Sequence, residues 1–95
     1  MKFIALEQEI PGVTEEQLHP HLRAEAARAW ELTQSGVFRE IYFRADVSSA
    51  VIVLECATTE EAHAALGTLP LVAHGLIRFD VIPLKPYTGF ARLFR

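Results

Sequence analysis

Hydrophobic and polar positions follow two different periods along this chain. Four segments, at 2–10, 37–45, 50–57 and 75–84, carry apolar residues on alternate positions or on both faces and are rich in β-branched and aromatic residues, which predicts strands. Two other segments, at 14–36 and 58–67, repeat their apolar positions at helical spacing. The stripe of the longer helix consists of Leu18, Leu22, Ala26, Ala29 and Leu32.

Local signals set the boundaries of these elements. Thr14–Gln17 and Thr58–Glu61 both read as capping boxes, in which side chains satisfy the free N–H groups at a helix start. Pro20 lacks an N–H group, so we expect the regular part of the first helix to begin near it. Gly36 supplies a left-handed helix end, and Asp46–Ser49 is a polar hairpin connection.

The predicted order, β-α-β-β-α-β, is typical of the ferredoxin-like α+β fold, in which two helices cover one face of a four-stranded antiparallel sheet. The face away from the helices is too apolar for full exposure to water. Its apolar residues are Tyr42, Val51, Val53, Leu76 and Ile82. We therefore expect a homodimer, or a larger ring, in which two sheets face each other.

Composition narrows the class of protein. A chain of 95 residues has room for one domain, 1–95, and small domains often gain stability by association. About half of the residues are apolar and none of the apolar runs approaches the ~20 residues of a membrane span, so a soluble protein is expected. The first residues do not resemble a secretory signal.

Charge and cysteine content argue against a nucleic-acid-binding, membrane-surface or disulfide-stabilised protein. A net charge of −3 with scattered basic residues gives no footprint for nucleic acid or for an anionic membrane. The single Cys56 excludes an internal disulfide and fits a reduced, cytoplasmic compartment, where we expect it to be a small buried hydrophobe. Small molecules and further copies of the chain remain as partners.

Leu69-Pro70-Leu71, followed after a short gap by a strand ending Val81-Ile82-Pro83-Leu84, resembles the muconolactone isomerase-like family of dimeric α/β-barrel proteins. The resemblance extends over most of residues 1–85, whereas residues 85–90 depart from the pattern of the true isomerases. It implies two ferredoxin-like protomers packed sheet to sheet. It also implies a proton transfer, without a cofactor, that shifts a double bond in an unsaturated lactone bearing a carboxylate.

Polar residues lie in phase on the sheet face that we expect to be covered. They are Glu40, Tyr42, Arg44, Glu55, Arg78 and Asp80. Buried charges are costly unless they are neutralised by one another or by a ligand. One interpretation is therefore a set of salt bridges across the dimer, and the other is a pocket for a small anionic metabolite.

The pocket interpretation gives each residue a role. Arg44 or Arg78 would hold a substrate carboxylate by forked hydrogen bonds. Glu55 or Asp80, its pKa raised by burial, would move the proton. Tyr42 would donate a hydrogen bond to the enolate oxygen.

Three other features are weaker candidates for a functional role. His74, beside Gly75, is a candidate substrate-binding residue at the mouth of the barrel, but the four histidines lack the spacing of a metal site. Trp30 lies at the edge of the first helix stripe, where packing is favoured over ligand stacking. The tail at 85–95 holds several large apolar residues and is expected to dock on a partner or over the barrel mouth.

Two functions remain open at this point. The first is a cofactor-independent, isomerase-like enzyme that acts in the dimer barrel. The second is a non-catalytic module for small-ligand binding or assembly, in which the same charges only join the protomers. A heme- or flavin-dependent oxygenase on this fold has no positive support in the sequence. An enzyme needs an open cavity of ~300 Å³ or more lined by a titratable group.

Overall fold

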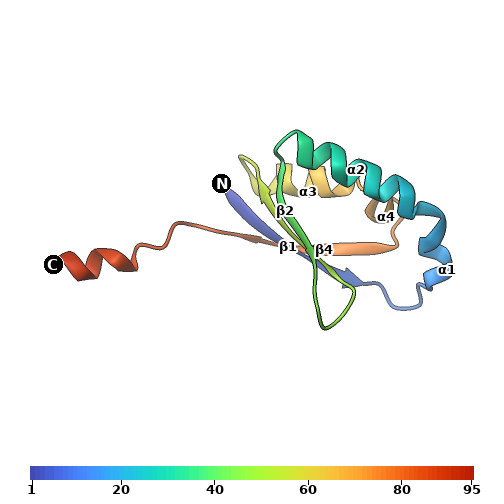
Figure 1. Ribbon diagram of the computed structural model, residues 1–95, viewed down its shortest axis with the longest axis horizontal. Helices are drawn as coiled ribbons and strands as arrows, with labels where there is room; N and C mark the ends of the chain where they lie inside the picture. The colour runs from blue at the N-terminus through green and yellow to red at the C-terminus, as the bar shows by residue number, and fades with distance from the viewer.

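The computed structural model describes residues 1–95 and confirms the predicted α+β, ferredoxin-like fold. Four antiparallel strands form one sheet in the order β2-β3-β1-β4, and the helices cover one of its faces (Figure 1). The elements are β1 (Lys2–Glu9), α1 (Glu15–Leu18), a 3₁₀ turn η1 (His19–His21), α2 (Leu22–Gln34), β2 (Phe38–Phe43), β3 (Ala50–Glu55), α3 (Thr59–Gly67), α4 (Pro70–Ala73), β4 (Ile77–Pro83) and a 3₁₀ helix η2 (Gly89–Phe94).

The first helical segment is divided near Pro20. Thr14 caps α1, with its N–H donating to Gln17 Oε1 at 2.8 Å, and the regular helix α2 begins only at Leu22, after the 3₁₀ turn that contains Pro20. Gly36 has a φ of +83°, as the predicted left-handed helix end requires.

One short helix was not predicted. The sequence interpretation expected Leu69-Pro70-Leu71 only to break the helical pattern, whereas Pro70 begins the four-residue helix α4. The fixed φ of proline suits the first position of a helix, where its missing N–H group has no partner to lose. This helix places Leu71 beside α2, where its N–H donates to Glu25 Oε1.

The core lies between the sheet and the helices. Its fully buried large side chains are Phe3, Phe38, Ile52, Leu54, Leu66 and Leu69. A β-bulge between Phe38 and Glu40 lets Phe38, Ile41 and Phe43 all face the helices despite their uneven spacing. No bulge interrupts β4, where Arg78 pairs with Gln8 and Asp80 with Leu6, so Arg78 and Asp80 point away from the helices as predicted.

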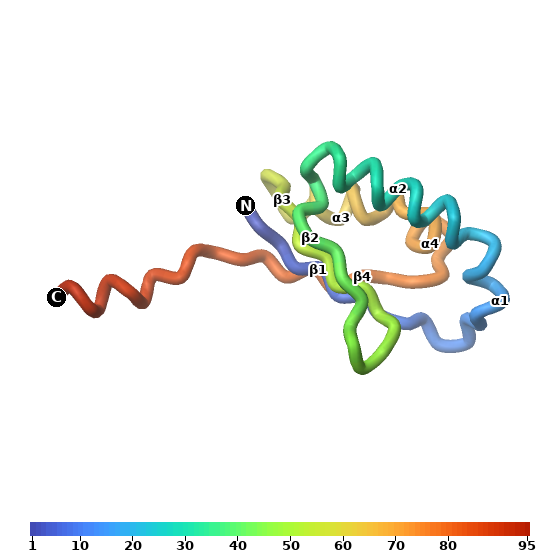
Figure 2. Tube along the Cα trace, viewed as in Figure 1, coloured from blue at the N-terminus to red at the C-terminus, as the bar shows by residue number.

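The C-terminal segment extends away from the body after β4, ending in η2 (Figures 1 and 2). It gives the molecule its long axis of 57 Å, against 28 and 21 Å in the other directions. Phe90, Leu93 and Phe94 are 67%, 74% and 85% exposed. None of the helices combines the length and hydrophobicity needed to span a bilayer.

Candidate functional site

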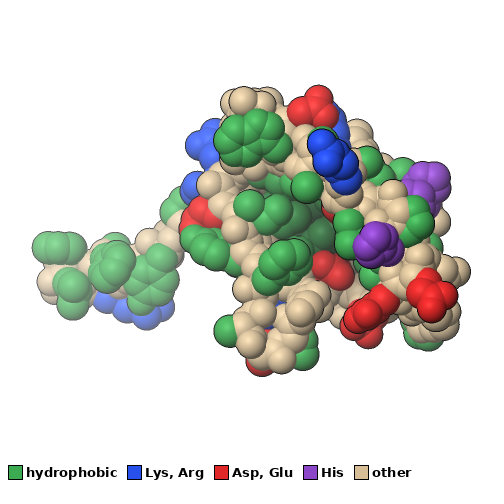
Figure 3. Space-filling view, turned by 45° about the vertical axis from the view of Figure 1, so that its right-hand side comes forward, with side chains coloured by type: hydrophobic (Ala, Val, Ile, Leu, Met, Phe, Trp, Pro, Cys, Tyr) green, Lys and Arg blue, Asp and Glu red, His purple; other side chains and the backbone are tan.

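A cleft of about 780 Å³ lies between α2 and the helix-covered face of the sheet. It exists because α2 buries only Leu32, while Leu22, Ala26 and Trp30 on the same helix face Ile41 of β2 across open space. Fifteen of its nineteen lining residues are hydrophobic. Figure 3 shows a hollow on the molecular surface with hydrophobic side chains on its floor.

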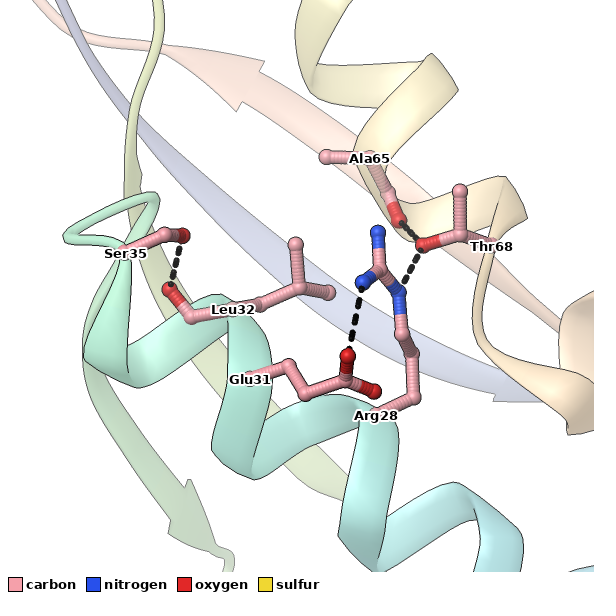
Figure 4. Close-up of polar contacts among 6 residues, drawn as sticks. All are labelled: Arg28, Glu31, Leu32, Ser35, Ala65 and Thr68. Carbon is pink, nitrogen blue, oxygen red and sulfur yellow. Dashed lines mark hydrogen bonds and ion pairs between the residues drawn. The ribbon is translucent and has the colours of Figure 1, made fainter.

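One polar contact on the other side of α2 links this helix to the residue that follows α3. Arg28 Nε donates to Thr68 Oγ1 at 2.9 Å, and Arg28 also lies 3.7 Å from Glu31 on its own helix (Figure 4). Thr68 in turn donates to the carbonyl of Ala65 at 2.6 Å. Arg28 thereby joins α2 to the end of α3.

Two carboxylates lie in the cleft. Glu7 Oε1 accepts a hydrogen bond from the backbone N–H of Ala50 at 2.9 Å, and Glu25 Oε1 accepts one from the N–H of Leu71 at 2.9 Å. Burial raises the pKa of Glu25; the Leu71 hydrogen bond opposes this rise and the charge of Glu7 adds to it. A carboxyl group that holds its proton more tightly than usual, in apolar surroundings, is suited to accept a proton from a ligand and return it.

The sequence interpretation missed both carboxylates, although each carried a signal. Glu25 is three residues after Leu22 and four before Ala29, so it occupies the apolar face of the helix. Glu7 follows the buried Ala5 by two positions and therefore shares its face of β1. An acidic residue at an apolar position of the pattern was the detectable sign in both cases.

Most of the predicted site residues lie on the outer face of the sheet, although Tyr42, on the edge strand β2, also lines the cleft, and His74 lies at the end of α4. Arg78 and Asp80 are brought together, with Arg78 Nη1 2.8 Å from Asp80 Oδ1. Arg44 instead pairs with Asp46 in the hairpin, with Arg44 Nε donating to Asp46 Oδ1 at 2.9 Å. All four of these side chains are exposed within the single chain.

Tyr42, Glu55 and His74 also have local partners. Tyr42 donates to Glu40 Oε1 at 2.7 Å, and this hydrogen bond raises the pKa of Tyr42. His74 stacks on His21 with ring centroids 4.3 Å apart.

The pocket interpretation gave a raised pKa to Glu55 or Asp80, and this remains a prediction because the pocket requires a second sheet. The amino group of Met1 lies 3.0 Å from Glu55 Oε2 and lowers the pKa of Glu55. Apart from Arg78 and Asp80, one chain does not gather the six predicted residues, and a shared pocket for them requires a second sheet.

Comparisons with known proteins give a family and a fold. The sequence model of the family described as muconolactone delta-isomerase matches residues 3–89. A solved structure of muconolactone isomerase is similar with a TM-score of 0.76, at 20% identity over 94% of this chain and 93% of that chain. No curated protein sequence matches.

A second solved structure is similar with a TM-score of 0.70, at 16% identity over 94% of this chain and 98% of that chain. It is 5-chloro-2-hydroxyhydroquinone dehydrochlorinase (TftG) from Burkholderia phenoliruptrix AC1100, in complex with 2,5-dihydroxybenzoquinone. Both structural similarities support the fold alone at these identities.

Proposed function

Because this chain belongs to the muconolactone delta-isomerase family, we propose that it is an isomerase-like enzyme that moves a proton within a small oxygen-bearing metabolite. The observation that carries the proposal is Glu25, a carboxyl group of raised pKa in a large apolar cleft. The cleft volume of about 780 Å³ lies within the range of small-molecule sites. The named lactone of one similar structure and the bound quinone of the other are small rings of this kind.

The geometry supports a defined role for Glu25. The Leu71 N–H group holds Oε1, which leaves Oε2 to face a ligand in the cleft. The carboxylate would accept a proton from the γ carbon of an α,β-unsaturated carbonyl system, and the C–H electron pair would pass into a dienolate. The protonated carboxyl group would then return the proton at the α carbon, next to the carbonyl group, so that the double bond moves and no atom is gained or lost.

Deuterium exchange tests this role. Muconolactone and its methyl ester are incubated with the protein in D₂O, and incorporation of deuterium at the ring carbons is followed by NMR. We expect Glu25→Gln to slow the exchange by about 100-fold or more, because general acid–base catalysis typically contributes that much. Glu31→Gln is the matched control, since Glu31 lies on the same helix, is exposed and lies outside the cleft.

Exchange that survives in Glu25→Gln would contradict the role of Glu25. A wild-type protein that binds these compounds without any exchange would instead indicate the second function, a non-catalytic ligand-binding module. The two outcomes differ because binding is measured separately, by calorimetry.

We further propose that the outer sheet face pairs with that of a second copy. Ile4, Leu6, Val51 and Val53 are only partly buried on this face, and Ile82 is 43% exposed. Pairing would remove this apolar surface from water. It would also bring the predicted polar set to the interface, as ion pairs between protomers or as the walls of a second pocket. That set comprises Tyr42, Arg44, Glu55, Arg78 and Asp80, whereas His74 lies beside His21 at the end of α4.

A further inference from the structure

We infer that the ligand of the cleft is an uncharged ring compound that carries hydroxyl or carbonyl groups, and not a carboxylate. This inference rests on the proposed function, because it concerns the same cleft, and it names the class of molecule that the cleft takes. It departs from the anionic metabolite that the sequence resemblance implied.

The charges of the cleft are all of one sign. Among its lining residues, Glu7 and Glu25 are the only charged ones, and there is no lysine, arginine or histidine. Neither carboxylate has an ion-pair partner. A carboxylate ligand would lose its hydration against hydrophobic walls and meet two like charges, without the forked arginine contact that usually offsets this cost.

The hydrogen-bonding groups of the cleft favour a ligand that donates. Glu7 and Glu25 each use one oxygen for a backbone N–H group and keep acceptor capacity for a ligand. The hydroxyl of Thr33 donates to the Ala29 carbonyl at 2.8 Å, and that of Tyr42 donates to Glu40, so both protons are already engaged. Among the lining side chains this leaves only two neutral donors for a ligand, the Ser48 hydroxyl and the Trp30 indole N–H. A ligand hydroxyl can donate to the carboxylates without the desolvation cost that an ammonium group would have in this apolar cleft.

A second copy of the chain offers one route by which a cation could reach the cleft. The tail carries Arg92 and Arg95 beside its exposed aromatic residues. If the tail of a partner lay over the cleft mouth, a guanidinium group would come within reach of a ligand carboxylate. An Arg92→Gln variant tests this route.

Matched ligands of one shape test the inference. Methyl 4-hydroxybenzoate, 4-hydroxybenzoate and 4-hydroxybenzylamine present an ester, a carboxylate and an ammonium group on the same ring at pH 7. Calorimetry on the full chain measures their affinities. Trp30, the only tryptophan, lines the cleft, so a change in its fluorescence reports binding there.

We expect the ester to bind at least about tenfold more tightly than the carboxylate, because the carboxylate would meet two like charges beside apolar walls. Glu7→Gln should reduce this ratio by removing one of the two charges. Glu31→Gln, an exposed change outside the cleft, should leave the ratio as it is in the wild type.

Three results would overturn the inference. The first is equal or tighter binding of the carboxylate than of the ester. If Arg92→Gln then abolished binding of the carboxylate, the cation that neutralises the ligand would be Arg92 of the tail. Tighter binding of the amine would show that the two carboxylates select a cation. No fluorescence change with any of the three compounds would contradict the cleft as a ligand site, and with it the proposed function. This outcome differs from the first two, which change only the preferred ligand and leave the cleft as a binding site.

Discussion

Glu25 occupies a position that packing alone would give to an apolar residue. It lies on the same helix face as Leu22 and Ala29, in a cleft whose walls are mainly hydrophobic. The backbone N–H of Leu71 compensates for only part of the lost hydration, so burial still raises the pKa of Glu25. A residue that breaks the local pattern at some cost in stability is typical of a functional site.

The raised pKa of Glu25 predicts that the free energy of unfolding depends on pH. The pKa of Glu25 in the folded protein lies above its ordinary value of 4.5, so between these two values the folded state binds more protons than the unfolded chain. The stabilising contribution is complete below the unfolded pKa and is lost as the pH rises through the folded pKa. Relative to Glu25→Gln, the wild type should therefore lose stability from about pH 4.5 upward, until Glu25 is fully ionised.

Urea unfolding of both proteins between pH 4 and pH 8 measures this difference. The comparison cancels the groups that the two proteins share, including Asp46 and Glu55, whose pKa values are lowered. A constant difference across the range would contradict the raised pKa of Glu25.

At the scale of elements, the start of α3 shows how a local cap supports the helix layer. The N–H of Glu61 donates to Thr58 Oγ1 at 3.1 Å, and Glu61 Oε2 accepts from the N–H of Ala57 at 2.9 Å. The capped helix places Ala62 and Leu66 in the core. Its far end leads to Thr68, which receives the hydrogen bond from Arg28 of α2.

Loss of the cap should destabilise the protein without affecting the cleft. Thr58→Ala removes the acceptor of the Glu61 N–H and should lower the free energy of unfolding by about 0.5–2 kcal/mol. Thr58→Ser keeps a hydroxyl and should stay close to the wild type. No residue of α3 lines the cleft, so ligand affinity should be unchanged in both variants. Equal destabilisation by alanine and serine in urea titrations would show that the hydroxyl is not the stabilising group.

At the scale of the whole molecule, two apolar surfaces have no partner within the chain. One is the outer face of the sheet, and the other is the tail, where the ring centroids of Tyr87 and Phe90 lie 4.9 Å apart but both side chains remain exposed. Surfaces of this kind usually mark interaction sites. The proposed assembly would cover both.

Light scattering at micromolar concentration should therefore find a dimer or a larger species. Deletion of residues 87–95 should weaken the assembly or lower the melting temperature, because it removes the apolar side chains that would dock on a partner. Deletion of Arg95 alone is the control and should leave the oligomeric state and the melting temperature as in the wild type. A stable, folded monomer of the full chain would refute the assembly, and an unchanged deletion variant would show that the tail has no docking role.

The sequence by itself determined the order of the elements, their caps and the two faces of the sheet. These features follow from signals within a few residues: the period of the apolar positions, the Thr14 and Thr58 caps and the left-handed Gly36. The same period placed Arg78 and Asp80 on the outer face. Even the unpredicted helix α4 begins at a residue, Pro70, whose backbone preference is local.

Only the tertiary structure decided where the cleft lies and which carboxylates enter it. Glu25 meets Leu71 across 46 positions of sequence and Glu7 meets Ala50 across 43, so no local pattern pairs them. The stripe that predicts a buried helix contains Leu22 and Ala26, which line an open cleft, because the position of α2 depends on its packing against β2 and α4. Periodicity tells which way a side chain points, whereas the space in front of it is set by elements distant in the chain.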